Sequence, residues 1–137
     1  MTTSQAALPL LLGNKDRILA ASTAAGPALE GAGIRFGMRG ATEAVKRATL
    51  QNGNVTVKVI EAGNRSVCGS GLIDAVAEML RVGIIRENGK LLNKEEYLHT
   101  CPAEYRGLVD RLETKNDMNC FVLVPEEQSQ NGQKIYM

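Results

Sequence analysis

The chain has 137 residues, the size of one ordinary domain, and its 44% hydrophobic and 23% charged residues are typical of soluble globular proteins rather than disordered ones. Lysine and arginine number 16 and aspartate and glutamate 15, so the net charge of +1 gives no reason to expect a nucleic acid or an anionic membrane as partner.

The start of the chain and its cysteines bear on the cellular compartment. The first residues lack the basic segment of a signal peptide, and the apolar run over 6–12 is too short to span a bilayer. Cys68, Cys101 and Cys120 are widely spaced, and His99 is the single histidine. These residues predict neither a disulfide framework nor a metal site, and we expect a cytoplasmic, reduced protein.

Residues 8–23 are expected to form a β-hairpin. An apolar run over 8–12 is followed by turn residues over 13–16, and a strand of small residues is predicted over 18–23. Glycine and asparagine in this turn tolerate the positive φ angles that tight turns need.

A glycine-rich segment over 24–33 follows the hairpin, and its bare backbone would let a ligand approach closely. Its one charged side chain, Glu30, has two interpretations. It either holds a ribose hydroxyl or a metal-bound water, or it caps a helix in a tight turn. The nearby Arg35 and Arg39 either pair with an acidic partner or a phosphate, or are solvated, as is commoner for surface arginines.

The middle of the chain predicts a helix, a turn and a strand. The segment 41–50 has helical composition with a narrow apolar face. Residues 51–54 form a turn around an Asn-Gly pair, and alternation with a period of two predicts a strand over 55–60.

A second glycine-rich loop over 63–71 leads into the clearest helix of the chain, predicted over 72–82. Ser70 is expected as the N-cap, with Asp74 in the first turn and Gly83 just beyond the last turn. The apolar positions expected to face the core are Leu72, Ile73, Val76, Met79 and Leu80.

The last third of the chain combines a helical region with a buried strand. Residues 93–119 are predicted to be helical and exposed, with Pro102 just before the second helix of this region. A buried strand is predicted over 120–124, a polar loop over 126–134 follows, and 135–137 begin a further element. Together the elements predict an α/β fold with packed helices.

The junction between the second glycine-rich loop and its helix has the form of an anion-binding site. Unpaired N–H groups at a helix N-terminus point outward and carry a partial positive charge. The loop does not match the phosphate-binding P-loop and has no lysine in place. It either contacts a phosphate or another ligand, or it is a tight loop that lets the helix pack closely on the strand over 55–60.

Cys68 lies in the same loop, near a helix N-terminus, as reactive cysteines often do. A nucleophilic role needs a histidine base, and nothing in the spacing links Cys68 to His99. A small buried hydrophobic residue is the preferred interpretation of Cys68, and a separate enzyme that uses this thiol ranks last.

Several strings together carry a resemblance to a known family. They are STAAGPALEG at 22–31, GMR at 37–39, CGSGLIDAVAE at 68–78, GII at 83–85 and FVLV at 121–124. In order and spacing they resemble the C-terminal ATPase part of the reductive activators of corrinoid iron–sulfur proteins, which belong to the ASKHA superfamily of acetate and sugar kinases, Hsp70 and actin. The resemblance covers nearly the whole chain from residue 12 onward.

The resemblance implies part of a ribonuclease-H-like lobe of the actin and Hsp70 type, with a mixed sheet. It also implies an activity that uses ATP and Mg²⁺ to drive reduction of a cobalt(II) corrinoid to cobalt(I). The implied partner is a corrinoid iron–sulfur protein or the corrinoid component of a methyltransferase, with homo-oligomers possible and no nucleic acid or membrane. The residues that the resemblance places at the nucleotide are Thr23, Gly26, Pro27, Glu30, Gly31, Cys68, Gly69, Ser70 and Gly71.

Three parts of the family pattern are missing from the 137 residues. The acidic D-x-G-T-N-G-E segment, which supplies ligands for phosphate and magnesium, is replaced by 2–9, which contain neither acid nor glycine. The A-G-G-F-G loop and the iron–sulfur domain are missing as well. We therefore expect a single domain over 1–137 that is a fragment of an ASKHA-type ATPase and is not catalytic alone, with no catalytic residue assigned. The alternative is a non-catalytic module that docks a corrinoid protein or a partner subunit.

Overall fold

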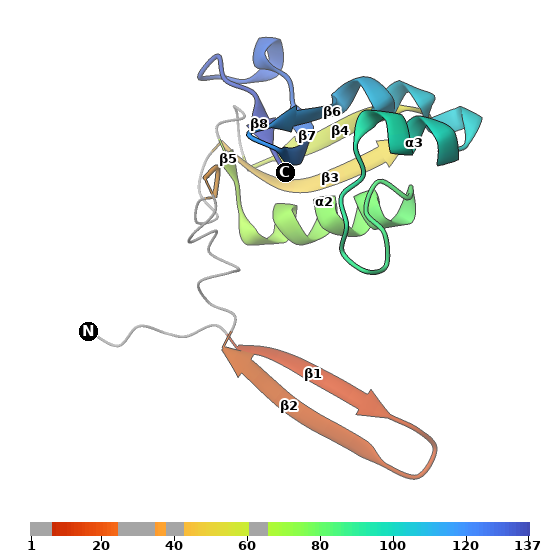
Figure 1. Ribbon diagram of the computed structural model, residues 1–137. Coiled ribbons are helices and arrows are strands. Elements are labelled where there is room, and N and C mark those ends of the chain that lie inside the picture. The colour runs from red at the N-terminus through yellow and green to blue at the C-terminus, as the bar shows by residue number, and fades with distance from the viewer. Residues whose placement is uncertain (1–6, 25–34, 38–42, 61–65) are drawn as a thin grey trace.

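The structure, a computed structural model, describes residues 7–24, 35–37, 43–60 and 66–137 (Figure 1). In these ranges the chain forms one two-stranded and two three-stranded sheets, together with α-helices and 3-10 helices. Strand pairing is antiparallel except for one parallel pair of strands. The predicted α/β fold class, with a mixed sheet and packed helices, is confirmed.

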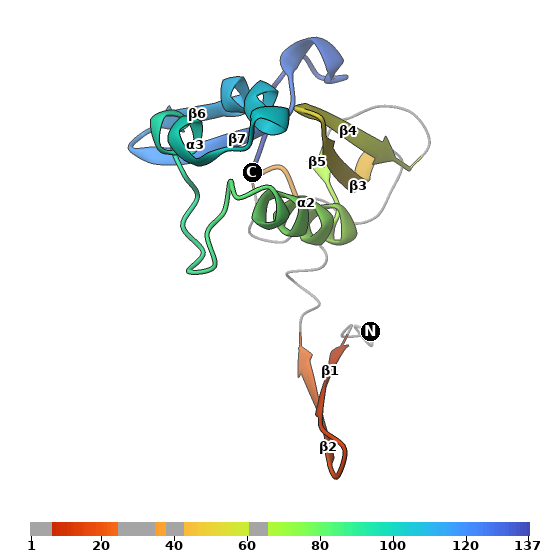
Figure 2. The same cartoon turned by 90° about the vertical axis from the view of Figure 1, so that its right-hand side faces the viewer.

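The first sheet is the predicted hairpin. β1 (Ala7–Gly13) pairs antiparallel with β2 (Ile18–Ala24). The side-chain oxygen of Asn14 accepts the N–H groups of Asp16 and Arg17 at 3.0 and 2.9 Å, which closes the turn. In both views the hairpin projects away from the other elements (Figures 1 and 2).

The second sheet starts with a hairpin of β3 (Ala44–Gln51) and β4 (Asn54–Val59). Asn52 and Gly53 form its turn with φ angles of 50° and 73°, a left-handed conformation that asparagine and glycine tolerate best. The predicted turn and the predicted strand after it are therefore confirmed.

The helix predicted over 41–50 is wrong, because this part of the chain forms β3 wherever it is described. The pairing register with β4 shifts between Val45 and Arg47, as at a β-bulge, which inserts one extra residue into a strand. The bulge breaks the alternation of buried and exposed residues, so the apolar pattern imitated one face of a helix. The buried residues of this strand are Ala44, Val45, Ala48 and Leu50.

β5 (Ser66–Val67) pairs parallel with β3 and leads into α2 (Gly69–Arg81). The helix predicted over 72–82 is thus confirmed. Gly83 follows it with a φ angle of 79°, as expected of the residue that ends a helix.

The first turn of α2 differs from the prediction. The N-cap is Cys68 rather than Ser70, and its side chain makes no capping hydrogen bond. Because the helix begins earlier, Asp74 lies beyond the first turn and instead pairs with Arg47, with 3.4 Å between Oδ2 and Nε.

α2 packs mainly against β3, whereas the close-packing interpretation placed it against the strand over 55–60. Gly71, Ala75 and Met79 face this contact and are buried. Part of the predicted apolar face is instead exposed. This α2 stripe consists of Ile73, Val76 and Leu80, whose exposed fractions are 51%, 40% and 46%.

α3 (Lys94–Thr100) begins with a capping box. The Asn93 side-chain oxygen accepts the Glu96 N–H at 2.8 Å, and the Glu96 carboxylate accepts the Asn93 N–H at 3.1 Å. The 3-10 helix η1 (Ala103–Arg111) follows, with Pro102 just before it as predicted.

The helical prediction is wrong for 112–119. β6 (Leu112–Lys115) and β7 (Met118–Val124) form an antiparallel hairpin there. Asn116 and Asp117 make its turn with φ angles of 49° and 61°. Two successive positive φ angles are typical of a hairpin turn, and asparagine and aspartate accept them more readily than most residues.

β7 confirms the strand predicted over 120–124. The polar segment after it contains the short 3-10 helix η2 (Glu126–Gln128). β8 (Ile135–Tyr136) then pairs antiparallel with β7 and belongs to the third sheet.

One apolar core joins α2, α3, η1 and the second and third sheets. It consists mainly of aliphatic side chains, and its largest fully buried members include Tyr97, Phe121, Leu50 and Met79. No helix in the described ranges is long and apolar enough to cross a membrane.

Candidate functional site

The residues predicted at the nucleotide fall into two groups. Gly26, Pro27, Glu30 and Gly31 lie outside the described residues, as does Arg39, while Thr23 lies on β2 opposite Leu8. The four residues 68–71 lie together at the start of α2. Their role at a nucleotide stays a prediction, and their geometry shows what each contributes to the fold.

Cys68 is buried at this end of α2, with 4% of its surface exposed. Its N–H donates to the Val45 carbonyl at 3.1 Å, and its thiol donates to the same oxygen at 3.3 Å. The thiol also lies 3.2 Å from the Ser70 hydroxyl. These contacts fit the interpretation of Cys68 as a small buried residue. His99 is exposed near the end of α3, as a surface residue would be.

Gly71 sets the distance between α2 and β3. A Cβ atom at this position would lie 2.0 Å from the Val45 carbonyl oxygen and 2.8 Å from its carbon. Only glycine allows so close an approach of two backbones. The packing of α2 on β3 therefore accounts for Gly71, whether or not a ligand also binds nearby.

The start of α2 keeps one exposed polar side chain, Ser70. In an α-helix the first N–H groups have no acceptor within the helix. In α2 the Leu72 N–H is the first to find an acceptor one turn back, because it donates to the Cys68 carbonyl at 2.9 Å. This end of α2 can therefore offer N–H donors and a hydroxyl to an anion.

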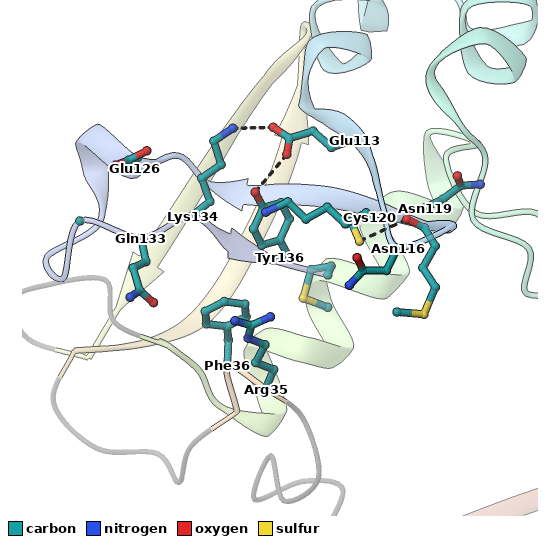
Figure 3. Close-up of a pocket in the computed structure, with 14 residues that line it drawn as sticks. Arg35, Phe36, Glu113, Asn116, Asn119, Cys120, Glu126, Gln133, Lys134 and Tyr136 are labelled. Atoms are coloured by element: carbon teal, nitrogen blue, oxygen red, sulfur yellow. Dashed lines mark hydrogen bonds and ion pairs between the residues drawn. The ribbon is translucent and has the colours of Figure 1, made fainter.

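A cavity of about 790 Å³ lies elsewhere, beside the third sheet. Arg35 and Phe36 form one side, and Tyr136 of β8 faces them (Figure 3). The Phe36 backbone is held in place because its carbonyl accepts the Val67 N–H at 2.7 Å and Gly37 forms a bridge with Val67 of β5.

The far side of the cavity holds a carboxylate that is already neutralised (Figure 3). Glu113 of β6 accepts hydrogen bonds from the Lys134 ammonium at 2.5 Å and from the Tyr136 hydroxyl at 3.0 Å. The bond from Lys134 is the main reason that the pKa of Glu113 is lowered, and the same bond raises the pKa of Lys134. The pair therefore stays charged and adds little net charge to the cavity.

Two further cations of the cavity lie against aromatic rings. The Lys115 ammonium lies 4.0 Å from the centre of the Tyr136 ring, and the Arg35 guanidinium lies 5.6 Å from the centre of the Phe36 ring. Within the part of the chain that the structure describes, neither cation has a carboxylate within ion-pair distance.

The sequence pointed to only one residue of this cavity, Arg35, as a possible partner of an acid or a phosphate. Phe36, Lys115, Lys134 and Tyr136 were not singled out. They come from distant segments. The pairing of β6, β7 and β8 brings Lys115 close to Tyr136, and the backbone contacts of Phe36 and Gly37 with Val67 of β5 place Phe36. No local sequence signal could have shown this.

Comparisons with known proteins agree on one family. Residues 9–137 match the family described as the C-terminal domain of RACo, the ASKHA domain. The corrinoid activation enzyme RamQ of Eubacterium limosum is 38% identical over 127 residues, which cover 92% of this chain and 21% of that protein.

A solved structure of a reductive activator for corrinoid, iron–sulfur protein matches with a TM-score of 0.70 and 31% identity. The match covers 94% of this chain and 19% of that one. The chain therefore spans about a fifth of the length of the relatives it matches.

Proposed function

The chain belongs to the family of the RACo C-terminal ASKHA domain, and we propose that it forms part of an ATP-dependent reductive activator of a corrinoid protein. The observation that carries the proposal is the structural match to a reductive activator at 31% identity over nearly the whole chain. In this proposal the chain is one part of the nucleotide-binding lobe and does not turn over alone. Its partner is a corrinoid iron–sulfur protein or the corrinoid component of a methyltransferase.

The proposed reaction adds one electron to a cobalt(II) corrinoid and yields cobalt(I). An iron–sulfur centre supplies the electron, and hydrolysis of ATP to ADP and phosphate supplies the free energy for this uphill transfer. The chain contributes binding and orientation. The N–H groups in the first turn of α2 and the Ser70 hydroxyl hold a phosphate, and Gly71 keeps the helix fixed on β3.

Magnesium is not provided for by the described residues. They contain no group of three or more His, Cys, Asp or Glu side chains that could hold a metal ion. Asp74, the first acidic residue after the start of α2, is paired with Arg47. The described part of this chain therefore offers no cluster of carboxylates for Mg²⁺.

Calorimetric titration with a non-hydrolysable ATP analogue and magnesium tests nucleotide binding. We expect saturable binding with a Kd below about 1 mM. Ser70→Asp places a carboxylate among the first N–H groups of α2 and should weaken binding about tenfold or more, because it repels phosphate. Ala77→Asp adds the same charge at an exposed position of the same helix and should have a smaller effect. No saturable heat in the wild type would contradict the proposed nucleotide site.

Corrinoid activation is tested in a separate assay. The chain is mixed with a cobalt(II) corrinoid protein and a low-potential reductant, and formation of cobalt(I) is followed by absorbance. Alone, the chain should give no ATP-dependent reduction. ATP-dependent reduction by the chain alone would contradict its role as a non-catalytic part.

The α2 stripe favours a second candidate function, a module that docks the corrinoid protein. Its three apolar side chains recur at helical spacing and are half exposed, as is typical of a face that another surface covers. Leu80→Asp should weaken binding to the corrinoid protein at least tenfold in a calorimetric titration. Leu98→Asp is the matched control, since Leu98 is 50% exposed on α3. Equal effects of the two variants would argue against docking through α2.

A further inference from the structure

The cavity beside the third sheet has no role in the function proposed above. It has a volume of about 790 Å³, which is within the usual range for small-molecule sites. We propose that this cavity binds a ribose phosphate that carries a planar base.

The aromatic side of the cavity suits a planar group. The rings of Phe36 and Tyr136 lie with their centres 6.2 Å apart and their planes tilted by 42° (Figure 3). Both side chains are only partly buried and both line the cavity. A flat base that enters between Arg35 and the third sheet would contact the rings of Phe36 and Tyr136. Stacking on aromatic rings stabilises any of the bases.

The cations of the cavity suit a phosphate. Lys115 and Arg35 are held against these two rings and have no carboxylate partner in the described ranges. Lys134, by contrast, is already committed to Glu113. A ligand with an anionic group next to a planar one would therefore contact Lys115 or Arg35 and an aromatic ring at the same time. Charge-assisted hydrogen bonds to phosphate are among the stronger polar contacts.

The amide side chains complete the chemistry that a ribose needs. Asn116, Asn119 and Gln133 line the cavity, and amides can both donate to and accept from hydroxyl groups. Asn119 already donates to the Leu91 carbonyl at 2.9 Å, which fixes its orientation. Two sources supply such a ligand: a free nucleotide, or the nucleotide tail of a corrinoid, in which a ribose phosphate links the ring to a planar base.

Titration with AMP, adenosine and ribose 5-phosphate, followed by calorimetry or by ligand-observed NMR, tests the shared chemistry. AMP should bind with a Kd below about 1 mM, and adenosine and ribose 5-phosphate should each bind about tenfold more weakly, because each lacks one of the two recognised groups. Adenosine that binds as tightly as AMP would overturn the proposal.

Exposed cation variants locate the binding. Lys115→Gln and Arg35→Gln should each weaken AMP binding about fivefold, because each removes one charge contact with the phosphate. Lys58→Gln is the control, since Lys58 is an exposed lysine of β4 that does not line the cavity. The side chains of Lys115 and Arg35 are exposed, so the two cation variants should fold normally. AMP binding that is unchanged in Lys115→Gln and Arg35→Gln would overturn the proposal.

Competition identifies the source of the ligand. Dicyanocobalamin carries the nucleotide tail detached from cobalt, and dicyanocobinamide lacks the tail. Displacement of AMP by the first and not by the second supports the corrinoid tail as ligand. Displacement by neither, with AMP binding still sensitive to Lys115→Gln, supports a free nucleotide. Displacement by both equally would overturn recognition of the tail and the proposal with it.

The outcome is separable from the proposed function. Ser70→Asp alters the start of α2 and should leave AMP binding at the cavity unchanged, because Ser70 does not line it. If binding of the ATP analogue does not respond to Ser70→Asp but AMP binding responds to Lys115→Gln, the proposed phosphate site at α2 fails and the cavity proposal stands. If binding of the ATP analogue responds to Ser70→Asp but AMP binding does not respond to Lys115→Gln, the cavity proposal fails and the proposed phosphate site at α2 stands.

Discussion

Gly71 shows how a single residue without a side chain places a helix. The Val45 carbonyl oxygen lies only 2.0 Å from the point at which the Cβ atom of any other residue would stand. The contact is backbone against backbone, so no flexible side chain can move aside. The last glycine of the string CGSG thus has a structural reason that holds whatever ligand is bound.

Gly71→Ala should lower the free energy of unfolding by about 3 kcal/mol, because α2 must shift away from β3 and loosen the core. Ala77→Ser, at an exposed position of the same helix, should cost only about 0.5 kcal/mol. Urea unfolding followed by circular dichroism measures both. A loss in Gly71→Ala no larger than that in Ala77→Ser would show that the helix does not approach β3 so closely.

Glu78 links α2 to the end of β3. Its carboxylate accepts the Leu50 N–H at 2.7 Å and two bonds from Arg81, and Arg81 in turn donates to the Leu50 carbonyl and to the Tyr105 hydroxyl. The hydrogen bonds from Arg81 are the main cause of the lowered pKa of Glu78, and the Leu50 N–H adds to it.

Because the folded-state pKa of Glu78 lies below its unfolded value, this carboxylate stabilises the fold above the unfolded pKa, and the contribution is lost as pH falls through the folded pKa. Glu78→Gln should lower the free energy of unfolding by about 1–2 kcal/mol near pH 7 and by less near pH 3. Urea unfolding at the two pH values checks this. A loss that is the same at both would exclude a charged role for Glu78. Glu96 and Glu113 also have lowered pKa values, so the variant keeps part of the pH dependence.

At the scale of elements, α3 begins where its sequence specifies. The capping box between Asn93 and Glu96 satisfies two N–H groups that the helix itself leaves unpaired. α3 has only seven residues, so it depends on its cap and on the buried Tyr97. The Tyr97 hydroxyl donates to the Val82 carbonyl at 3.1 Å, and burial raises the pKa of Tyr97 to about 12.

Asn93→Ala should lower the free energy of unfolding by about 1 kcal/mol, because the Glu96 N–H loses its acceptor. Asn93→Asp keeps an acceptor oxygen and should stay within about 0.5 kcal/mol of the wild type. Thermal or urea unfolding distinguishes the two variants. Equal losses in both would show that the cap contributes nothing specific.

Two elements differ from their local sequence signals for identifiable reasons. In β3, the irregular pairing between Val45 and Arg47 hides the alternation that marks a strand. In the β6–β7 hairpin, the Asn116–Asp117 turn is a real turn signal, but it lies in a polar segment that also has helical composition. The first error arises from tertiary pairing and the second from an overlooked turn.

At the scale of the whole molecule, the β1–β2 hairpin makes few contacts with the rest of the described chain. Its two strands contact mainly each other, and Ile18 and Leu19 are 73% and 59% exposed. An isolated two-stranded hairpin is at best marginally stable in water. Among the described residues, the buried cluster that forms the apolar core is drawn from residues 45–135, and Phe36 packs against it.

Removal of residues 1–24 should therefore leave the free energy of unfolding of the remaining chain within about 0.5 kcal/mol of the wild type. The measurement is urea unfolding monitored by tyrosine fluorescence, which changes as Tyr97 and Tyr105 become exposed to water. The transition should remain cooperative. A large loss of stability, or loss of cooperativity, would show that the hairpin packs on the core after all.

The sequence by itself determined the elements that short-range chemistry specifies: the turns at Asn14 and at Asn52–Gly53, the helix α2 and the strand β7. It also determined the family, because strings such as CGSGLIDAVAE are specific without knowledge of any contact. Only the tertiary structure decided that 44–51 form a strand, which face of α2 is buried, and that Arg35, Lys115 and Tyr136 share one cavity. These features depend on backbones and side chains that are distant along the chain, whereas turn preference and periodicity act over only a few residues.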